Sequence, residues 1–301
     1  MKKKGKEFVD RIRKWFTNKF PEGLLKKERT ENILMIAGGV IIVIALLGLI
    51  YTIRQYSKSD RIYQDAQKKF VVILPEEDDI DASSQKNDVN ENKETSTEPD
   101  NGGKETDDRE WYELANVDLE GLQAEYPDVA GWILFENEDI SYPVVYSGDN
   151  ETYIRTMYTG KKAEAGSIFM DGESTPDFSD PHTLIYGHNM KNGSMFAGIT
   201  KFGDTEYFNA HRYGWLATSD KVYRLDFFSL AHVDCDDSFY DGSQPITEWI
   251  PHVERLSTIC TGITYDASDR FISLSTCTRA TGDDRTVLTG RLVEIGGDTD
   301  E

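Results

Sequence analysis

One short stretch of the sequence combines a nucleophile with a strand-like pattern. From Phe271 to Cys277 the side chains alternate in character, so Ser275 and Cys277 share one face of the predicted strand. A turn-like run, ATGDD, follows at residues 280–284, and the chain from Arg285 onward again has the composition of a strand. An antiparallel hairpin would place Arg285 near Cys277. The pattern therefore predicts a cysteine at a strand end with a cation facing it.

A reactive cysteine needs a base or cation that favours its thiolate, and His188 is the first candidate. Residues 183–186 are strand-like and Gly187 interrupts them, so this histidine also lies where a strand gives way to a loop. His182 lies six residues earlier, on the same face of a continuous strand, and remains an accessory or rival base. We expect the other three histidines to be structural or surface residues: His211, His232 and His252.

These motifs together resemble a known family. Tyr-Gly-His at 186–188, Leu-Ser-Thr-Cys at 274–277 and Arg285 resemble the catalytic signature of the sortases, the membrane-anchored cysteine transpeptidases of Gram-positive bacteria. The resemblance covers roughly residues 111–295. It narrows to class B members through four flanking segments: Asp128–Ile133, Tyr142–Val145, Gly166–Asp171 and Gly187–Phe196.

The predicted chemistry is acyl transfer through a thioester. Cys277 would attack a peptide carbonyl, and His188 would protonate the departing amine and later deprotonate the incoming one. Arg285 would stabilise the oxyanion, hold the substrate carbonyls in register, or do both. Ser275 and Thr276 are predicted to contact the substrate. No Cys and His spacing indicates a zinc site, and we expect neither metal nor cofactor.

The resemblance also implies the partners. A sortase cleaves a short C-terminal sorting motif of a secreted protein after its threonine and transfers the acyl group to an amine of peptidoglycan or its precursor. Class B members often recognise motifs such as Asn-Pro-Gln-Thr-Asn, frequently in haem uptake, whereas others recognise Pro-x-Thr-Gly variants or build pili. Thr278 stands where some class B members have an acidic residue, so a role for that acid does not transfer.

Two alternatives use some of the same residues. A cell-wall cysteine peptidase of the papain-like type would only hydrolyse, but such enzymes usually place the cysteine before the histidine, opposite to the order here. A non-catalytic surface module would bind without turnover. Cys235 and Cys260 lack the surrounding motifs of Cys277, and we expect them to be inert or buried. The odd total of three cysteines leaves at least one thiol unpaired.

Charge and hydropathy divide the N-terminal part of the chain. The first 32 residues carry eleven Lys or Arg and five Asp or Glu, a net of +6, whereas the whole 301-residue chain has a formal charge of −21. Ile33–Ile53 is an uncharged run of 21 residues, which as a helix spans ~30 Å, the thickness of a bilayer core. Tyr51–Tyr56 offers no small-residue cleavage site, which favours an uncleaved single-pass anchor. The charge bias predicts a cytoplasmic N-terminus and an extracellular catalytic domain, and so short a basic tail does not indicate nucleic-acid binding.

The remaining sequence predicts a mainly β catalytic domain. Many short strands in under 200 residues favour a closed or nearly closed barrel, and the resemblance implies eight strands, short helices ahead of them and a helix inserted before the cysteine strand. The pattern of that helix begins at Ile246, and Pro251 predicts either a kink or a later start. The predicted segments are a basic cytoplasmic tail that is either a membrane-surface helix or solvated (1–32), a transmembrane helix (33–53), a helical stalk (54–74), an acidic disordered linker (75–109), the catalytic domain (110–296) and a C-terminal tail (297–301).

Overall fold

The computed structural model describes residues 27–73, 115–135, 140–278 and 283–295. The chain separates into two compact units, Met1–Gln55 and Tyr56–Glu301. The predicted linker (75–109) and C-terminal tail (297–301) lie outside the described residues, as does most of the basic tail. The two units are therefore described separately.

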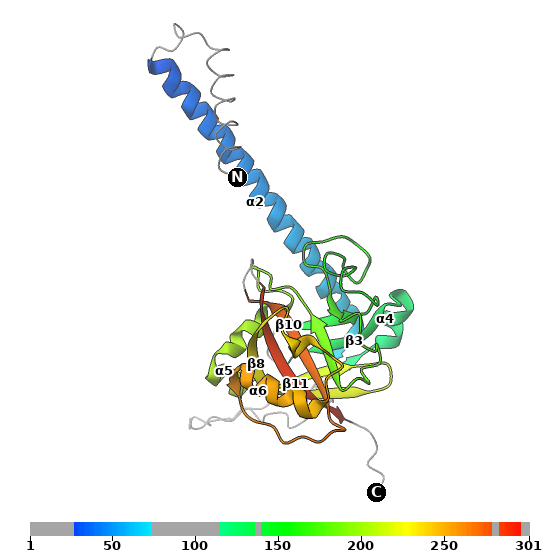
Figure 1. The fold of residues 1–301 in the computed structure, drawn as a ribbon. Helices are drawn as coiled ribbons and strands as arrows, with labels where there is room; N and C mark the ends of the chain where they lie inside the picture. The colour runs from blue at the N-terminus through cyan, green and yellow to red at the C-terminus, as the bar shows by residue number, and fades with distance from the viewer. Residues whose placement is uncertain (1–26, 74–114, 136–139, 279–282, 296–301) are drawn as a thin grey trace, which may run out of the picture. The chain divides into compact units, whose positions relative to one another are not determined.

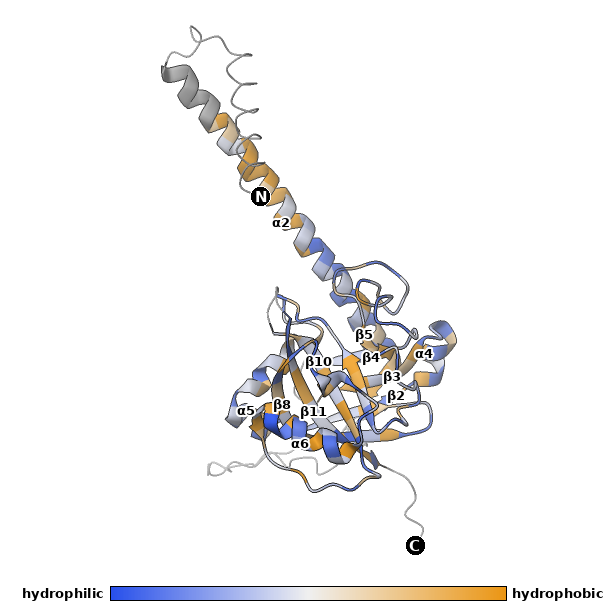
Figure 2. Cartoon of the chain, viewed as in Figure 1, coloured by the Kyte–Doolittle hydropathy of each residue, from blue (hydrophilic) through white to orange (hydrophobic). Residues whose placement is uncertain are grey.

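A long helix, α2 (Lys27–Phe70), contains the apolar run predicted to cross a membrane. The large apolar side chains described between Met35 and Ile53 are exposed, and Figure 2 shows them as a band along this part of the helix. By length and composition the helix is able to span a bilayer. Exposed apolar side chains along a helix of this length are what a lipid-facing segment requires.

The last turns of α2 belong to the second unit. Tyr63, Ala66 and Phe70 recur at helical spacing, and all three are buried in its core. The helix ends at Phe70 and is followed by strand β1 (Val71–Ile73), which pairs antiparallel with β2 (Ala115–Val117). Residues 71–73 are β-branched, which favours a strand over the helix expected there. The segment expected to be a stalk is thus packed against the folded unit over its C-terminal half.

The second unit is built on a closed barrel, as predicted. Within the described residues, eight strands follow one another in the order β11-β10-β6-β5-β4-β3-β7-β8, and pairing of β11 with β8 closes the ring. A further strand, β9 (Ser257–Cys260), adds to β8. The barrel strands are β3 (Val129–Leu134), β4 (Ser141–Val145), β5 (Ile168–Met170), β6 (His182–Tyr186), β7 (Tyr213–Ala217), β8 (Val222–Asp234), β10 (Arg270–Cys277) and β11 (Asp284–Ile295).

Short helices decorate the barrel (Figure 1). The predicted helix ahead of the barrel is α4 (Leu119–Glu125), and the predicted inserted helix is α6 (Ile246–Leu256). Of the two alternatives for this helix, a kink or a later start, the later start is wrong, because α6 begins at Ile246 and includes Pro251. Three further helical segments were not predicted: η4 (Phe196–Gly203), α5 (Thr205–Ala210) and η5 (Ser238–Tyr240).

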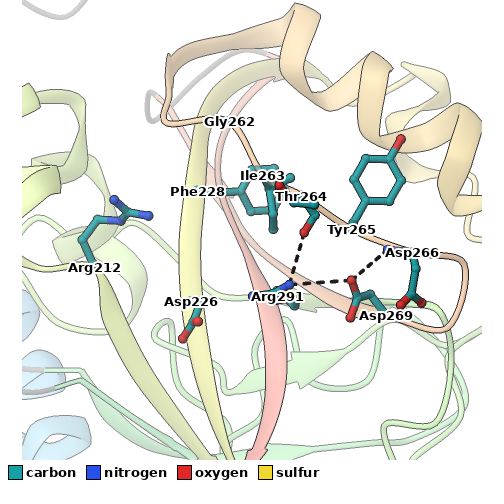
Figure 3. A pocket seen from close by; sticks show the side chains of 10 residues that line it. All are labelled: Arg212, Asp226, Phe228, Gly262, Ile263, Thr264, Tyr265, Asp266, Asp269 and Arg291. Atoms are coloured by element: carbon teal, nitrogen blue, oxygen red, sulfur yellow. Dashed lines mark hydrogen bonds and ion pairs between the residues drawn. The ribbon is translucent and has the colours of Figure 1, made fainter.

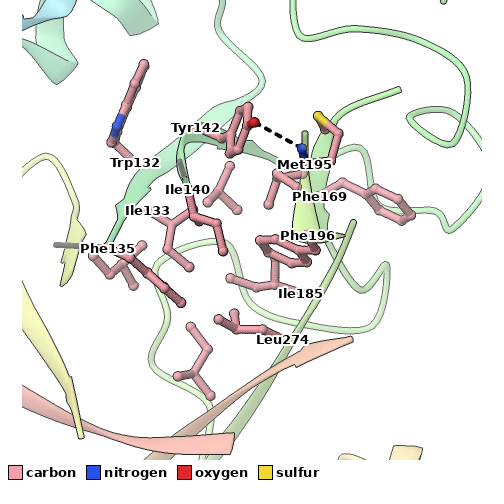
Figure 4. Close-up of a cluster of buried hydrophobic side chains, with 14 of the residues drawn as sticks. Trp132, Ile133, Phe135, Ile140, Tyr142, Phe169, Ile185, Met195, Phe196 and Leu274 are labelled. Atoms are coloured by element: carbon pink, nitrogen blue, oxygen red, sulfur yellow. Dashed lines mark hydrogen bonds between the residues drawn. The ribbon is translucent and has the colours of Figure 1, made fainter. Parts of the chain in front are cut away.

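The alternation of β10 separates two hydrophobic clusters. Ile272 and Leu274 join the cluster that fills the barrel, part of which Figure 4 shows. Phe271, on the opposite face, packs with Trp249 of α6 in a second cluster. Cys277 is six residues after Phe271, so its side chain is on the same face of β10, which is the outer face of the barrel wall.

Candidate active site

Three adjacent strands bring the predicted catalytic residues together. Cys277 at the end of β10 is in direct register with Arg285 on β11. On the other side of β10, Ser275 is in register with Tyr186 at the end of β6, two residues before His188. Neighbouring strands lie ~4.8 Å apart. Cys277 thus ends the middle strand, β10. His188 follows the end of β6 on one side, and Arg285 lies on β11 on the other.

All five predicted site residues line one cavity of about 590 Å³: His188, Ser275, Thr276, Cys277 and Arg285. Its volume is typical of pockets that bind small ligands or short peptide segments. The cavity wall also contains residues to which the sequence analysis gave no role, among them Asn150, Ile154, Asp171, Tyr186, Cys235 and Tyr240. The sequence therefore named the chemical groups of this cavity but not most of its wall.

The His188 ring is held through one of its two nitrogens. Its Nε2 lies 2.7 Å from the main-chain oxygen of Ile154. A carbonyl oxygen only accepts hydrogen bonds, so Nε2 carries a proton in this contact and Nδ1 is the nitrogen left to exchange one. Gly187 precedes the histidine because a Cβ there would lie 2.6 Å from a ring carbon of Phe196 and 2.5 Å from the Ile168 side chain. The close packing at this glycine fixes where β6 ends and the histidine begins.

The main chain at Cys277 is tied to the histidine loop. Asn189, the residue after His188, donates its Nδ2–H to the Cys277 carbonyl oxygen over 2.9 Å. The Cys277 side chain is half-buried and faces the cavity. A hydrogen bond between the two loops restrains the separation of thiol and imidazole, although these residues are far apart in sequence.

The Arg285 charge acts on several groups around the cavity. Burial raises the pKa of Tyr240 to about 12, and the guanidinium opposes that rise. Burial and the Asp171 carboxylate raise the pKa of Tyr186, again opposed by Arg285. Burial, followed by three neighbouring carboxylates, raises the pKa of the Cys235 thiol, again opposed by Arg285, so this second cysteine of the cavity stays protonated near neutral pH. A fixed positive charge therefore faces the space beside Cys277.

Ser275 and Thr276 occupy different surroundings. Ser275 is buried, and its hydroxyl lies 3.1 Å from the hydroxyl of Tyr240, whose ring stacks on Tyr186. Thr276 is also buried, and the alternation of β10 turns its side chain to the barrel interior. Its hydroxyl has no hydrogen-bond partner among the described residues. Ser275 therefore contributes a side chain to the cavity wall, and Thr276 contributes main chain.

A polar network lines the side of the cavity formed by β5 and β6. The Asp171 carboxylate accepts hydrogen bonds from the Tyr186 hydroxyl at 2.8 Å and from Asn150 at 2.9 Å. Tyr186 and Asp171 both fall within sequence motifs noted above, so the sequence offered a way to place them near His188. Asn150 belongs to none of these motifs. This network gives the cavity a hydrogen-bonding, anionic group in addition to its arginine.

The rival histidine does not reach the cavity. His182 is buried, with its Nε2 2.9 Å from the Ser273 hydroxyl and its ring centroid 3.8 Å from that of Trp249. Burial lowers its pKa to about 3. Because the imidazole lies beneath α6 and not among the cavity residues, it is not placed to act on Cys277.

None of the three cysteines, all within the described residues, forms a disulfide. Cys235 is half-buried and Cys260 is exposed. Asp234, Cys235 and Asp236 bring their potential ligand atoms within 4.8 Å of one another. The Cys235 thiol donates a hydrogen bond to the Asp236 carboxylate over 3.7 Å, and a thiol must lose its proton to bind a metal. These three residues alone do not define a metal centre.

A second cavity of about 620 Å³ lies where β8, β11 and the loop before β10 meet. Figure 3 shows Arg291 reaching toward Thr264 and Asp269, with Asp226 on the neighbouring strand. The Arg291 guanidinium donates to the Thr264 carbonyl at 3.3 Å and lies 3.7 Å from the Asp269 carboxylate. Its lining contains neither cysteine nor histidine. The second cavity therefore lacks the thiol and imidazole that the first cavity combines.

Comparison with known proteins agrees with this geometry. Residues 136–293, more than half of the chain, match the sequence profile of the sortase domain. The chain is 34% identical over 182 residues to sortase B of Listeria monocytogenes, covering 58% of this chain and 74% of that protein. Crystal structures of sortase B are similar in fold. That from Bacillus anthracis, in complex with AAEK1, has a TM-score of 0.59 at 26% identity and covers 80% of this chain and 99% of the other. That from Clostridium perfringens has a TM-score of 0.54 at 30% identity and covers 58% and 99%.

A closed barrel with a cysteine at the end of one strand, matched over this length, defines a cysteine transpeptidase, and the chain belongs to the sortase family. Within that family it is a class B sortase, as the sequence motifs predicted. Sortases act on proteins that bear sorting signals and on components of the cell wall.

Proposed function

We propose that Cys277, His188 and Arg285 carry the transpeptidase reaction of this chain. The observation that supports this assignment is their convergence, from three adjacent strands, on one cavity. Two other side chains of the same chemical types are less suitable. His182 is buried under α6, and the thiol of Cys235 is held protonated by burial and by nearby carboxylates.

The first half of the reaction forms a thioester. The Cys277 thiolate attacks the carbonyl carbon of the sorting-motif threonine, and the tetrahedral intermediate collapses with cleavage of the C–N bond to the following residue. The departing amine takes a proton from His188, at Nδ1 because Nε2 is bonded to Ile154. The C-terminal part of the substrate then leaves as a free amine.

The second half reverses these steps with a new amine. The incoming amino group attacks the thioester carbonyl, His188 accepts its proton, and Cys277 leaves as thiolate. Arg285 stabilises the oxyanion of both tetrahedral intermediates, since its fixed charge already acts on the groups around this cavity. Ser275, held by Tyr240, contacts the bound peptide.

The substrates we propose are a C-terminal sorting motif of a secreted protein and an amine of peptidoglycan or its precursor. The cavity favours an extended peptide with polar side chains, because its walls carry the Asp171–Tyr186 network on one side and Arg285 on the other. The chain would act at the cell membrane as a single-pass protein, with its basic N-terminus in the cytoplasm and the barrel outside. Protease added to intact cells should then remove the barrel but leave the N-terminal tag of a tagged chain.

The direct test uses the full chain in detergent, because the turns of α2 from Tyr56 onward are packed into the catalytic unit. A pentapeptide library with threonine at the fourth position is incubated with and without hydroxylamine as amine acceptor. A hydroxamate product that depends on Cys277 supports the proposal. Free acid as the only product under both conditions indicates a cysteine peptidase instead, and peptide binding without cleavage indicates a surface binding module.

A further inference from the structure

One turn of α2 contacts both segments that surround His188. Asp60 and Tyr63 lie three residues apart and so project from the same face of the helix. Tyr63 contacts Gly166 in the segment before β5. This segment packs against the Ile154 carbonyl oxygen, which accepts the hydrogen bond of the His188 ring. Asp60 contacts the loop that follows the histidine. The end of the helix that carries the apolar segment thus reaches the region of the site without lining the catalytic cavity.

The Tyr63 contact leads to the His188 ring through two backbone segments. The Tyr63 hydroxyl donates to the Gly166 carbonyl oxygen over 2.5 Å, and the tyrosine is almost fully buried. Gly166 has a φ of 55°, and a Cβ there would lie 2.2 Å from the carbonyl oxygen of Ile154. That same oxygen is the hydrogen-bond partner of His188 Nε2. A shift of the Gly166 main chain therefore changes the position of the atom that orients the imidazole.

The Asp60 contact reaches the histidine from the other direction. Asn192 donates its Nδ2–H to the Asp60 carboxylate, at 3.2 and 3.1 Å from its two oxygens. Asn192 lies in the loop closed by a bridge between Asn189 and Met195, directly after His188. Asn189 in turn bonds the Cys277 carbonyl oxygen. The helix therefore holds the loop that connects the histidine with the main chain of the cysteine.

We propose that Asp60 and Tyr63 are positioning residues for His188, so that the helix following the apolar segment is a functional part of the active site. The inference depends on the catalytic role proposed for His188. Tyr63 keeps the Ile154 carbonyl in place, which leaves Nδ1 facing the reacting groups, and Asp60 restrains the loop that connects the histidine to Cys277. Both residues act through others, and neither touches substrate.

Variants that remove the Tyr63 hydroxyl or the Asp60 carboxylate test this positioning role in the full chain. The probes are hydroxylamine and the sorting peptide, which is the library pentapeptide that the parent chain cleaves. Tyr63→Phe retains the ring contacts with Tyr142 and Tyr158 but loses the bond to Gly166. A net hydrogen bond of ~0.5–1.5 kcal/mol corresponds to about a two- to tenfold change in rate. We expect kcat to fall by about this factor with KM unchanged within about twofold, because ring orientation and not peptide binding is altered.

Asp60 offers an independent pair of variants. Asp60→Leu removes the acceptor of Asn192 and should lower kcat by a similar factor, whereas Asp60→Asn keeps an acceptor oxygen and should restore most of the rate. This pair of Asp60 variants tests the positioning role of α2 even if Tyr63→Phe does not fold. Tyr158→Phe is the matched control, since that hydroxyl also bonds the helix, at the Ile62 carbonyl, but does not contact Gly166. It should retain the parent kcat.

His188→Ala, measured in parallel, separates the two proposals. If it retains activity, the proposed function is wrong about the histidine. If it is inactive while Tyr63→Phe and Asp60→Leu both keep the parent kcat, the positioning inference alone is wrong. A loss in Tyr158→Phe equal to that in Tyr63→Phe, or a rise in KM at constant kcat, would likewise overturn it, because either result indicates general loosening of the helix or altered peptide binding.

Discussion

Two cavities of similar volume lie on the outer face of the barrel wall, and each has an arginine of β11. The catalytic cavity of about 590 Å³ contains Arg285, and the second, of about 620 Å³, contains Arg291. In the second, the arginine contacts Asp269 and a carbonyl oxygen of a loop that it ties to the barrel (Figure 3). In the first, the arginine shares the cavity lining with Cys277 and His188. The comparison teaches that volume and charge do not distinguish the proposed reaction site from a structural ion-pair cluster, whereas a thiol and an imidazole in one lining do.

The largest expected effect separates the two cysteines of the catalytic cavity. Cys277→Ala removes the nucleophile, and we expect the rate of hydroxamate formation to fall by at least about 10⁴-fold. Cys235→Ala should remain active, because its thiol is held protonated and donates to Asp236. Product formation followed by mass spectrometry checks both variants. Loss of turnover in Cys235→Ala alone would reverse the assignment of the nucleophile.

The second effect compares the two arginines directly. Arg285→Ala should lower kcat by about 10²–10³-fold, the usual effect of losing an oxyanion contact. Arg291→Ala, six residues along the same strand, should leave kcat and KM within about twofold of the parent, since its contacts are with the loop at residues 264–269. Steady-state kinetics with the sorting peptide provides the measurement. Equal losses in the two variants would mean that β11 contributes through its fold and not through one catalytic cation.

A third prediction concerns pH and contrasts the buried histidine with the cavity. The folded-state pKa of His182 is about 3, against an ordinary value of 6.5. Below pH 6.5 the unfolded chain binds a proton that the folded chain does not, so stability falls as the pH drops from about 6.5 toward 3. The slope from this residue is at most ~1.4 kcal/mol per pH unit. Urea unfolding at pH 7, 6 and 5 should show a shallower loss for His182→Gln than for the parent.

The activity of His182→Gln is the control for its stability measurement. Because His182 lies under Trp249 and outside the cavity, His182→Gln should keep a measurable kcat at pH 7. If the variant folds with parent-like stability yet has no activity, His182 has a direct part in the reaction and the choice of His188 needs revision.

The smallest expected effect belongs to the second cavity. Asp269→Asn weakens a contact of 3.7 Å with Arg291, and both side chains are partly exposed. Ion pairs of this kind contribute ~0–1 kcal/mol. We expect the free energy of unfolding to change by no more than this, with peptide cleavage unaffected. A change in turnover comparable to that of Arg285→Ala would show that the second cavity participates in the reaction.

The sequence predicted most of what depends on neighbouring residues. The alternation of residues 271–277 and the turn that follows gave β10, its hairpin partner and the Cys277–Arg285 register. Very short strands were missed, such as the four-residue β9 and the three-residue β1. Three or four residues carry too little periodicity to identify a strand, and their pairing depends on segments far along the chain.

What the sequence alone determined is the set of chemical groups: the thiol of Cys277, the imidazole of His188 and the guanidinium of Arg285, each near a strand end, together with an apolar run long enough to cross a membrane. Only the tertiary structure decided which other groups join them and which do not. It buried His182 beneath α6, placed Cys235 in the catalytic cavity, and brought Tyr63 to Gly166 from 103 residues away. The reason is physical. The alternation of a strand depends only on side chains that are neighbours in the sequence, whereas burial and long-range hydrogen bonds arise only when the barrel closes through β11 and β8.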